Sequence, residues 1–331
     1  MRIYRCPACD AEVYFRNLTC SCGQALEFHP GQDSFKPLQN GCANREKIDC
    51  NWVASEKAAL CASCATTEVI PDLSLPENLQ LWSDAELAKR WVLIGLYRLG
   101  WFVPGAPRPV FRFLAEATSA GKQRVVMGHA AGVITINVTE ADPVIRVTRR
   151  EALDEDYRTL IGHMRHELAH FMQWVLYDTP QFVTAFRALF GDETADYGAA
   201  LKDHYQNDAP ADWQSLFITA YASAHPHEDW AESFAHLLHL VDILDSAEAA
   251  GLHLPGSGPP LSDAYLEDNS ELLISKALDY GISLNHLNRS MGLADLYPFV
   301  VNDPARRKLV FVHNWVRLPQ AARPMTSSET V

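Results

Sequence analysis

All eight cysteines of this 331-residue chain lie between Cys6 and Cys64, and the rest of the sequence contains none. Because they are confined to one segment, they serve a local unit rather than the whole chain. The first twenty residues lack the apolar run of a signal peptide, so we expect a cytoplasmic protein in a reducing compartment. Closely spaced cysteines in such a compartment are metal ligands more often than disulfide partners.

The cysteines fall into two sets of four, each containing one or two short-spaced pairs. The sets are Cys6, Cys9, Cys20 and Cys22, followed by Cys42, Cys50, Cys61 and Cys64. Four thiolates can close a tetrahedral shell around zinc, and a closed shell leaves no position for a substrate. We therefore predict one or two structural zinc sites. Two alternatives stay open: ligands from the two sets could interleave, and the segment could bind a protein partner.

The charge of the chain argues against a nucleic-acid partner. The formal net charge is −13, and even residues 1–75 carry seven Lys and Arg against nine Asp and Glu. Affinity for nucleic acid comes mainly from clustered basic side chains, which are missing here. The densest apolar run, at 91–103, is interrupted by Arg98 and Gly100, so we expect no membrane span.

The sequence suggests a small domain followed by a large one. Residues 1–75 are expected to form a zinc-ribbon-like domain, which ends at the proline-containing stretch 71–76. Residues 76–318 are expected to form the main domain, because 48% hydrophobic composition supplies a sizeable core. Residues 319–331 are expected to be a disordered tail.

Periodicity predicts the elements of the main domain. Ser83 and Glu86 match a capping box, which predicts a helix start. Residues 123–139 change to the period-two pattern of a β-strand. Helices are predicted at 157–177, 180–190, 193–206, 211–222, 228–245 and 264–280, with a Gly- and Pro-rich loop at 251–260.

The predicted helix 157–177 contains the pattern H-E-x-x-H, with His166, Glu167 and His170. Positions four apart lie on one face of a helix, so both imidazoles can bind one zinc ion. Glu167 lies between them and is expected to act as the general base that takes a proton from water. We therefore predict a catalytic zinc site with His166 and His170 as ligands.

A catalytic zinc needs a third protein ligand and one open position. A second acidic cluster follows at 227–232, and either Glu228 or Glu232 could supply the ligand. Asp229 and Glu232 are also candidates for hydrogen bonds to the ligating imidazoles. For Glu232, a solvated carboxylate near a helix N-terminus is an equally good interpretation.

The run from His225 to Phe234, H-P-H-E-D-W-A-E-S-F, resembles the corresponding segment of anthrax lethal factor and its relatives. In that family the first Glu of the segment is the third zinc ligand, which favours Glu228. A Tyr seven residues earlier points at the metal and stabilises the oxyanion, and Tyr221 occupies that position here. The resemblance covers about fifteen residues besides the H-E-x-x-H pattern.

A broader resemblance extends over nearly the whole chain, to a family of bacterial zinc-binding metallopeptidases with an N-terminal zinc ribbon. The segments that carry it are C-A-N at 42–44, C-N-W at 50–52, G-H at 128–129, G-V-I-T-I-N at 132–137, Y-R-T-L at 157–160, G-H at 162–163, R-H-E at 165–167 and L-N-R-S-M-G at 287–292. It implies an α+β, zincin-like peptidase domain, mainly helical with a small sheet. It also implies that an edge strand receives the substrate backbone, and residues 131–138 suit that role.

Other histidines are weaker candidates. His163 lies one turn before His166 but is better interpreted as a hydrogen-bonding or core residue, and His129 is either a cleft or a turn residue. His236 and His239 are expected to pack or to lie on the surface. The chain contains none of the phosphate-loop, dinucleotide-binding or serine-hydrolase patterns.

The predicted function is hydrolysis of peptide bonds in a peptide or protein substrate by a metal-activated water. Two alternatives are a zinc-ribbon binding module with a vestigial zincin site, and a hydrolase of non-peptide amides. The intact Glu167 argues against the vestigial site, because a structural zinc needs no general base.

Overall fold

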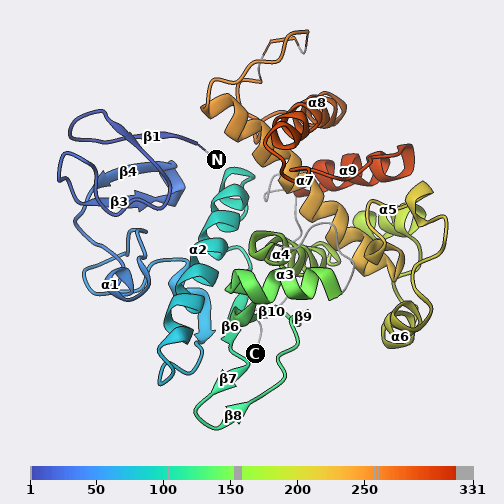
Figure 1. Ribbon diagram of the computed structural model, residues 1–331, viewed down its shortest axis with the longest axis horizontal. Helices are drawn as coiled ribbons and strands as arrows, with labels where there is room; N and C mark the ends of the chain where they lie inside the picture. The colour runs from blue at the N-terminus through green and yellow to red at the C-terminus, as the bar shows by residue number, and fades with distance from the viewer. Residues whose placement is uncertain (1, 103–104, 153–158, 257, 260, 318–331) are drawn as a thin grey trace. The chain divides into compact units, whose positions relative to one another are not determined.

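A computed structural model describes residues 2–102, 105–152, 159–256, 258–259 and 261–317. The predicted tail 319–331 and residues 157–158 of the predicted motif helix lie outside the described residues. The chain divides into two compact units, 1–167 and 168–331, and the division falls inside helix α4 (Leu160–Leu176). Figure 1 shows the helices and strands of both units.

The first unit begins with short strands and loops. Its elements are β1 (Tyr4–Arg5), β2 (Glu12–Val13), β3 (Leu26–His29), β4 (Ser34–Pro37), α1 (Arg45–Ile48) and β5 (Thr67–Val69), with 3-10 turns η1 (Pro30–Gln32) and η2 (Cys64–Thr66). The pairs β1–β2 and β3–β4 are antiparallel. Tyr4, Phe28 and Phe35 form a small core, with ring centroids 5.1–5.4 Å apart in edge-to-face contacts.

Helix α2 (Glu77–Arg98) follows. It begins six residues before the predicted capping box, so that prediction was wrong. Pro76 occupies the N-cap position, and Glu86 is fully buried instead of capping. The Glu86 carboxylate accepts a hydrogen bond from Thr67 at 2.6 Å and pairs with buried Lys89 at 2.9 Å. The residue that marks the start of α2 in the sequence is Pro76, because Pro is favoured at the beginning of a helix.

Strands from before and after α2 in the sequence form a four-stranded sheet, with strand order β5-β6-β10-β9. Strands β6 (Val110–Leu114) and β10 (Val133–Asn137) are parallel, and β9 (Gly128–Ala130) pairs antiparallel with β10. The predicted edge strand 131–138 is therefore interior, and β9 forms the edge. The period-two pattern detected β10, but the predicted strand 123–139 was too long, because it also includes β9 and the turn before β10. Strand order depends on partners distant in sequence.

The rest of the first unit leads from the sheet strands to the motif helix. Strands β7 (Ala117–Thr118) and β8 (Gly121–Lys122) form a hairpin, and the 3-10 turn η3 (Val138–Ala141) ends β10. The Asn137 side chain accepts a hydrogen bond from the Thr139 N–H and caps that turn. Helix α3 (Pro143–Ala152), which the sequence did not predict, precedes α4.

The second unit is helical. Its helices are the C-terminal part of α4, α5 (Pro180–Phe190), α6 (Tyr197–Asn207), α7 (Pro226–Ala249), α8 (Ser270–Ser290) and α9 (Asp303–Val316). Helix α7 packs against α8 and α9 (Figure 1). Trp230 is fully buried among the rings of Phe182, Phe186 and Phe311.

Two helix predictions in this unit need correction. The predicted helix 211–222 consists of two 3-10 turns, η4 (Trp213–Ser215) and η5 (Tyr221–Ser223). The predicted helix 264–280 begins at Ser270, because the Asn269 side chain caps its first turn, and it continues to Ser290. Among the described residues, no helix combines the length and apolar character needed to cross a bilayer.

Candidate metal centres

Helix α4 presents the H-E-x-x-H pattern on a partly accessible face. Met164, Leu168 and Met172 are fully buried and fix the opposite face in the core. His166 and His170 are half-buried, one turn apart. Glu167 is 7% exposed. The local pattern thus holds both imidazoles on one side of a rigid element.

Glu228 lies in the first turn of helix α7. Pro226 occupies the first turn, and the His225 side chain caps the helix by accepting a hydrogen bond from the His227 N–H at 3.1 Å. The indole N–H of Trp230 donates to the Ala169 carbonyl at 2.8 Å, which ties α7 to α4. This contact brings the buried Glu228 carboxylate to His170, with Oε2 3.6 Å from Nε2.

The structure brings His166, His170 and Glu228 together: one possible ligand atom from each lies within 4.8 Å of the other two. A tetrahedral shell with ligand bonds of about 2.1 Å places its ligand atoms about 3.4 Å apart. The distance of 3.6 Å between His170 and Glu228 is close to that value. Two imidazoles and one carboxylate fit a zinc ion that keeps one position open.

Tyr221 lies in the turn η5, which contacts α7. Its ring centroid is 5.7 Å from that of His204 and 6.5 Å from that of Tyr205. Burial, with a further contribution from the nearby Glu228 carboxylate, raises the pKa of Tyr221 above its usual value. The phenol therefore stays protonated at neutral pH and can donate a hydrogen bond.

Tyr197 was not predicted as a site residue. Its hydroxyl donates a hydrogen bond of 2.6 Å to Oε1 of Glu228. No spacing rule relates Tyr197 to a glutamate thirty-one residues later. The only sequence signal is Asp196, whose side chain caps helix α6 and so fixes Tyr197 at its first position.

Asp229 and Glu232 contact residues other than the three clustered ligands. Asp229 is buried, and Lys308 Nζ lies 2.6 Å from its Oδ2. Burial raises the pKa of Asp229 to about 7, although Lys308 opposes the shift. Glu232 accepts a hydrogen bond from the Thr219 hydroxyl at 2.9 Å. Lys308 also donates to the Leu216 carbonyl at 3.0 Å, so it links helix α9 to the chain before η5.

The remaining histidines have structural neighbours. The His129 ring accepts a hydrogen bond from the Gly132 N–H at 3.0 Å, in the turn between β9 and β10. His163 Nε2 lies 3.9 Å from the buried Glu140 carboxylate. His236 is buried against Tyr297, with 3.0 Å between Nδ1 and the hydroxyl. His239 is buried beside His236.

His227 contacts polar groups next to the cluster. Its Nδ1 lies 2.8 Å from Gln173 Oε1, and its ring packs edge-on against Tyr177. Burial lowers the pKa of His227 to about 4, so the imidazole is neutral at physiological pH. No motif in the sequence points to Gln173 or Tyr177.

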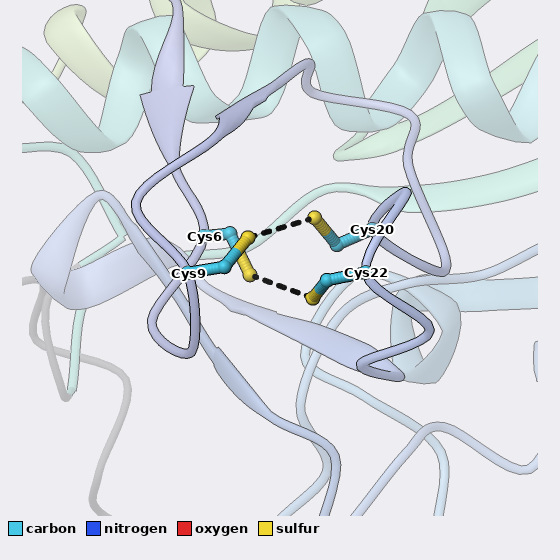
Figure 2. A group of neighbouring side chains, drawn as sticks. All are labelled: Cys6, Cys9, Cys20 and Cys22. Atoms are coloured by element: carbon cyan, nitrogen blue, oxygen red, sulfur yellow. Dashed lines mark hydrogen bonds between the residues drawn. The ribbon is translucent and has the colours of Figure 1, made fainter.

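The first cysteine set converges at the end of the β1–β2 hairpin and the loop that follows (Figure 2). Cys6 Sγ lies 3.9 Å from Cys22 Sγ, and Cys9 Sγ lies 3.7 Å from Cys20 Sγ. A disulfide would need about 2.05 Å, whereas zinc with bonds of about 2.3 Å holds its sulfurs about 3.8 Å apart. The arrangement fits zinc.

The second set forms its own group, so the sulfurs do not interleave. Cys50 Sγ lies 3.6 Å from Cys61 Sγ and 3.7 Å from Cys64 Sγ, and the Cys61 N–H donates to Cys42 Sγ at 3.3 Å. These distances also fit zinc. All four side chains are buried, whereas Cys9 and Cys22 of the first set are exposed.

Two family models match separate parts of the chain. A family described as "Putative zinc-binding metallo-peptidase" matches residues 78–315, and a zinc-ribbon domain matches residues 3–75. Proteins described as uncharacterized from Mycobacterium bovis and from two strains of Mycobacterium tuberculosis are each 37% identical over 326 residues, covering 96% of this chain and 95% of the relative. No solved structure matches the chain.

The family match covers most of the chain and confirms the broader resemblance inferred from the sequence, to zinc-binding metallopeptidases with an N-terminal zinc ribbon. The fold class is also confirmed as α+β. The chain therefore belongs to this family of zinc-binding metallopeptidases, with a zinc-ribbon domain at its N-terminus and a metallopeptidase domain after it.

Proposed function

We propose that the protein is a zinc-dependent peptidase that hydrolyses peptide bonds in a peptide or protein substrate. The observation that carries the proposal is the convergence of His166, His170 and Glu228, with Glu167 on the same helix as the two histidines. Family membership supports the same reaction class. In this proposal the three converging residues hold the catalytic zinc, while residues 1–75 form the ribbon domain and residues 76–318 the peptidase domain.

Zinc bound by these residues would polarise the scissile carbonyl and lower the pKa of the attacking water. Glu167 takes the proton from that water and later delivers it to the leaving amine. The phenol of Tyr221 donates a hydrogen bond to the oxyanion as its charge develops. We assign extended substrate binding to the edge strand β9, because its outer backbone groups can pair with a peptide strand.

The two cysteine groups are assigned to structural zinc. Their closed four-thiolate shells leave no position for substrate, and they stabilise a segment with a small core. The first group lies partly at the surface. We propose that binding of a protein partner is a secondary role of the ribbon domain.

Metal analysis tests the catalytic site directly. The three groups correspond to three zinc ions per chain, and His166→Ala is expected to leave two. His253→Ala is the matched control, because His253 is exposed and outside all three groups. Equal zinc content in the two variants would remove His166 from the ligand set.

Activity is tested by screening peptide and non-peptide amide libraries with the wild-type protein and with its chelator-treated form. Chelator-sensitive cleavage of peptides is expected. Cleavage confined to non-peptide amides, or no cleavage by a fully zinc-loaded protein, would contradict the proposal.

Tyr221→Phe tests the oxyanion assignment. Loss of one donor to a developing oxyanion typically costs about 10²–10³-fold in kcat, and KM should change little because the ground state does not use the bond. Steady-state kinetics on a peptide identified by the screen provide the measurement. Unchanged kcat would exclude Tyr221 from the mechanism.

A further inference from the structure

The two oxygens of Glu228 have different neighbours. Oε2 lies 3.6 Å from His170 Nε2, on the side where the candidate ligands converge. Oε1 accepts the hydrogen bond of 2.6 Å from the Tyr197 hydroxyl. A bond this short is typical of a hydroxyl that donates to a charged carboxylate. The two oxygens of the carboxylate thus face different groups. Oε2 faces the candidate metal ligands, and Oε1 is bonded to the phenol.

Tyr197 is held at this position by the backbone around it. It is the first residue of α6, and the Asp196 side chain accepts a hydrogen bond from the Ala199 N–H at 2.9 Å to cap that helix. The Tyr197 ring packs edge-on against His225, with centroids 5.2 Å apart. His225 Nε2 in turn lies 3.2 Å from the Ala195 carbonyl. The start of α6 is therefore attached to the residue that caps α7, one turn from Glu228.

We propose that Tyr197 is a positioning residue that restricts Glu228 to one-oxygen coordination of the zinc ion. This inference rests on the proposed function, because it concerns the same metal site. A carboxylate can bind a metal through one oxygen or through both, and the second oxygen would occupy the position that a catalytic zinc must keep open. The hydrogen bond to Tyr197 opposes coordination through both oxygens, because Oε1 would have to leave the Tyr197 hydroxyl to reach the metal. It also fixes the orientation of Oε2 before the metal binds.

The role differs from that of Tyr221, which is assigned to the oxyanion. A group that orients a ligand changes metal affinity, and partners of ligating residues typically contribute 10–100-fold to it. A group that touches only the transition state changes kcat and leaves metal affinity unaltered. The roles of Tyr197 and Tyr221 can therefore be distinguished by measuring metal affinity and kcat.

Tyr197→Phe in the full-length protein tests the inference. The side chain lies at the surface, with 42% of the residue exposed, so the variant is expected to fold. Zinc retained per chain is measured during titration with dipicolinate, which removes the catalytic metal before the thiolate-bound metals. We expect the catalytic site to lose affinity by about 10–100-fold, with unchanged thermal unfolding of the protein freed of that metal.

Tyr205→Phe is the matched control, since Tyr205 lies on the same helix with 66% of its surface exposed. It should retain wild-type zinc affinity. Wild-type affinity in Tyr197→Phe would overturn the inference, even if its kcat fell, because that pattern would assign Tyr197 to the oxyanion. A wild-type chain that binds no third zinc would instead refute the proposed function, so the two failures are distinguishable.

Discussion

Replacing Glu167 with Gln is expected to reduce kcat by about 10²–10⁴-fold while zinc content stays at the wild-type value. The amide has nearly the shape of the carboxylate but cannot take a proton from water. Glu167 is not among the clustered ligand residues, so the substitution leaves the metal site intact. Steady-state kinetics on a cleaved peptide, with zinc analysis of the same sample, provide the measurement.

Glu68→Gln controls for the change of charge. Glu68 lies on β5 and pairs with Arg112 at a surface position, where an ion pair contributes little to stability. This variant should retain wild-type kcat. If Glu167→Gln cleaved the peptide at the wild-type rate, Glu167 would not be the base, and the water would have to be activated by another group.

Local signals in the sequence predicted the part of the candidate site that lies on one helix. His166 and His170 are four residues apart, and any helix that includes them places them on one face. The buried positions Met164 and Leu168 repeat at helical spacing, so the helix itself was predictable. This half of the site required no knowledge of the fold.

The other half depends on tertiary contacts. Glu228 reaches His170 because Trp230 bonds to the Ala169 carbonyl, a contact between residues far apart in the sequence. Only the resemblance to a known zincin segment selected Glu228 over Glu232. Tyr197 was missed because its contact with Glu228 joins the starts of two helices, and no periodicity describes such a contact.

Errors in the fold prediction have the same origin. The alternation at 133–137 identified a strand, but its position inside the sheet follows from pairing with both β6 and β9. The capping-box pattern at Ser83 competed with the stronger signal of Pro76, and the burial of Glu86 against Lys89 decided the outcome. Sequence patterns predicted whether a segment forms a helix or a strand better than they predicted which elements it contacts.

The second large expected effect concerns the buried cysteine group and Arg90 on helix α2. Arg90 is 1% exposed, and its Nε and Nη1 have no hydrogen-bond partner among the described residues. Burial disfavours its charge, but Cys50, Glu86 and Cys64 outweigh this and raise the pKa of Arg90. Zinc bound by four thiolates carries a net charge of about −2, which Arg90 would partly offset.

Cys61→Ser is therefore expected to release one zinc and to destabilise the first unit strongly. Removing one partner of a buried charge pair typically costs about 3–5 kcal/mol, because the other charge stays buried without compensation. Hydrogen exchange of the α2 amides and zinc analysis measure the two effects. Protection of α2 should fall together with the zinc content.

Cys22→Ser is the matched control, because Cys22 is an exposed member of the other cysteine group. It should also release one zinc, but α2 should keep its protection, since the buried group and Arg90 are unchanged. Equal loss of α2 protection in both variants would contradict the argument, because the effect would then follow zinc loss in general rather than an uncompensated charge. Full zinc content in Cys61→Ser would contradict the assignment of the buried group as a zinc site.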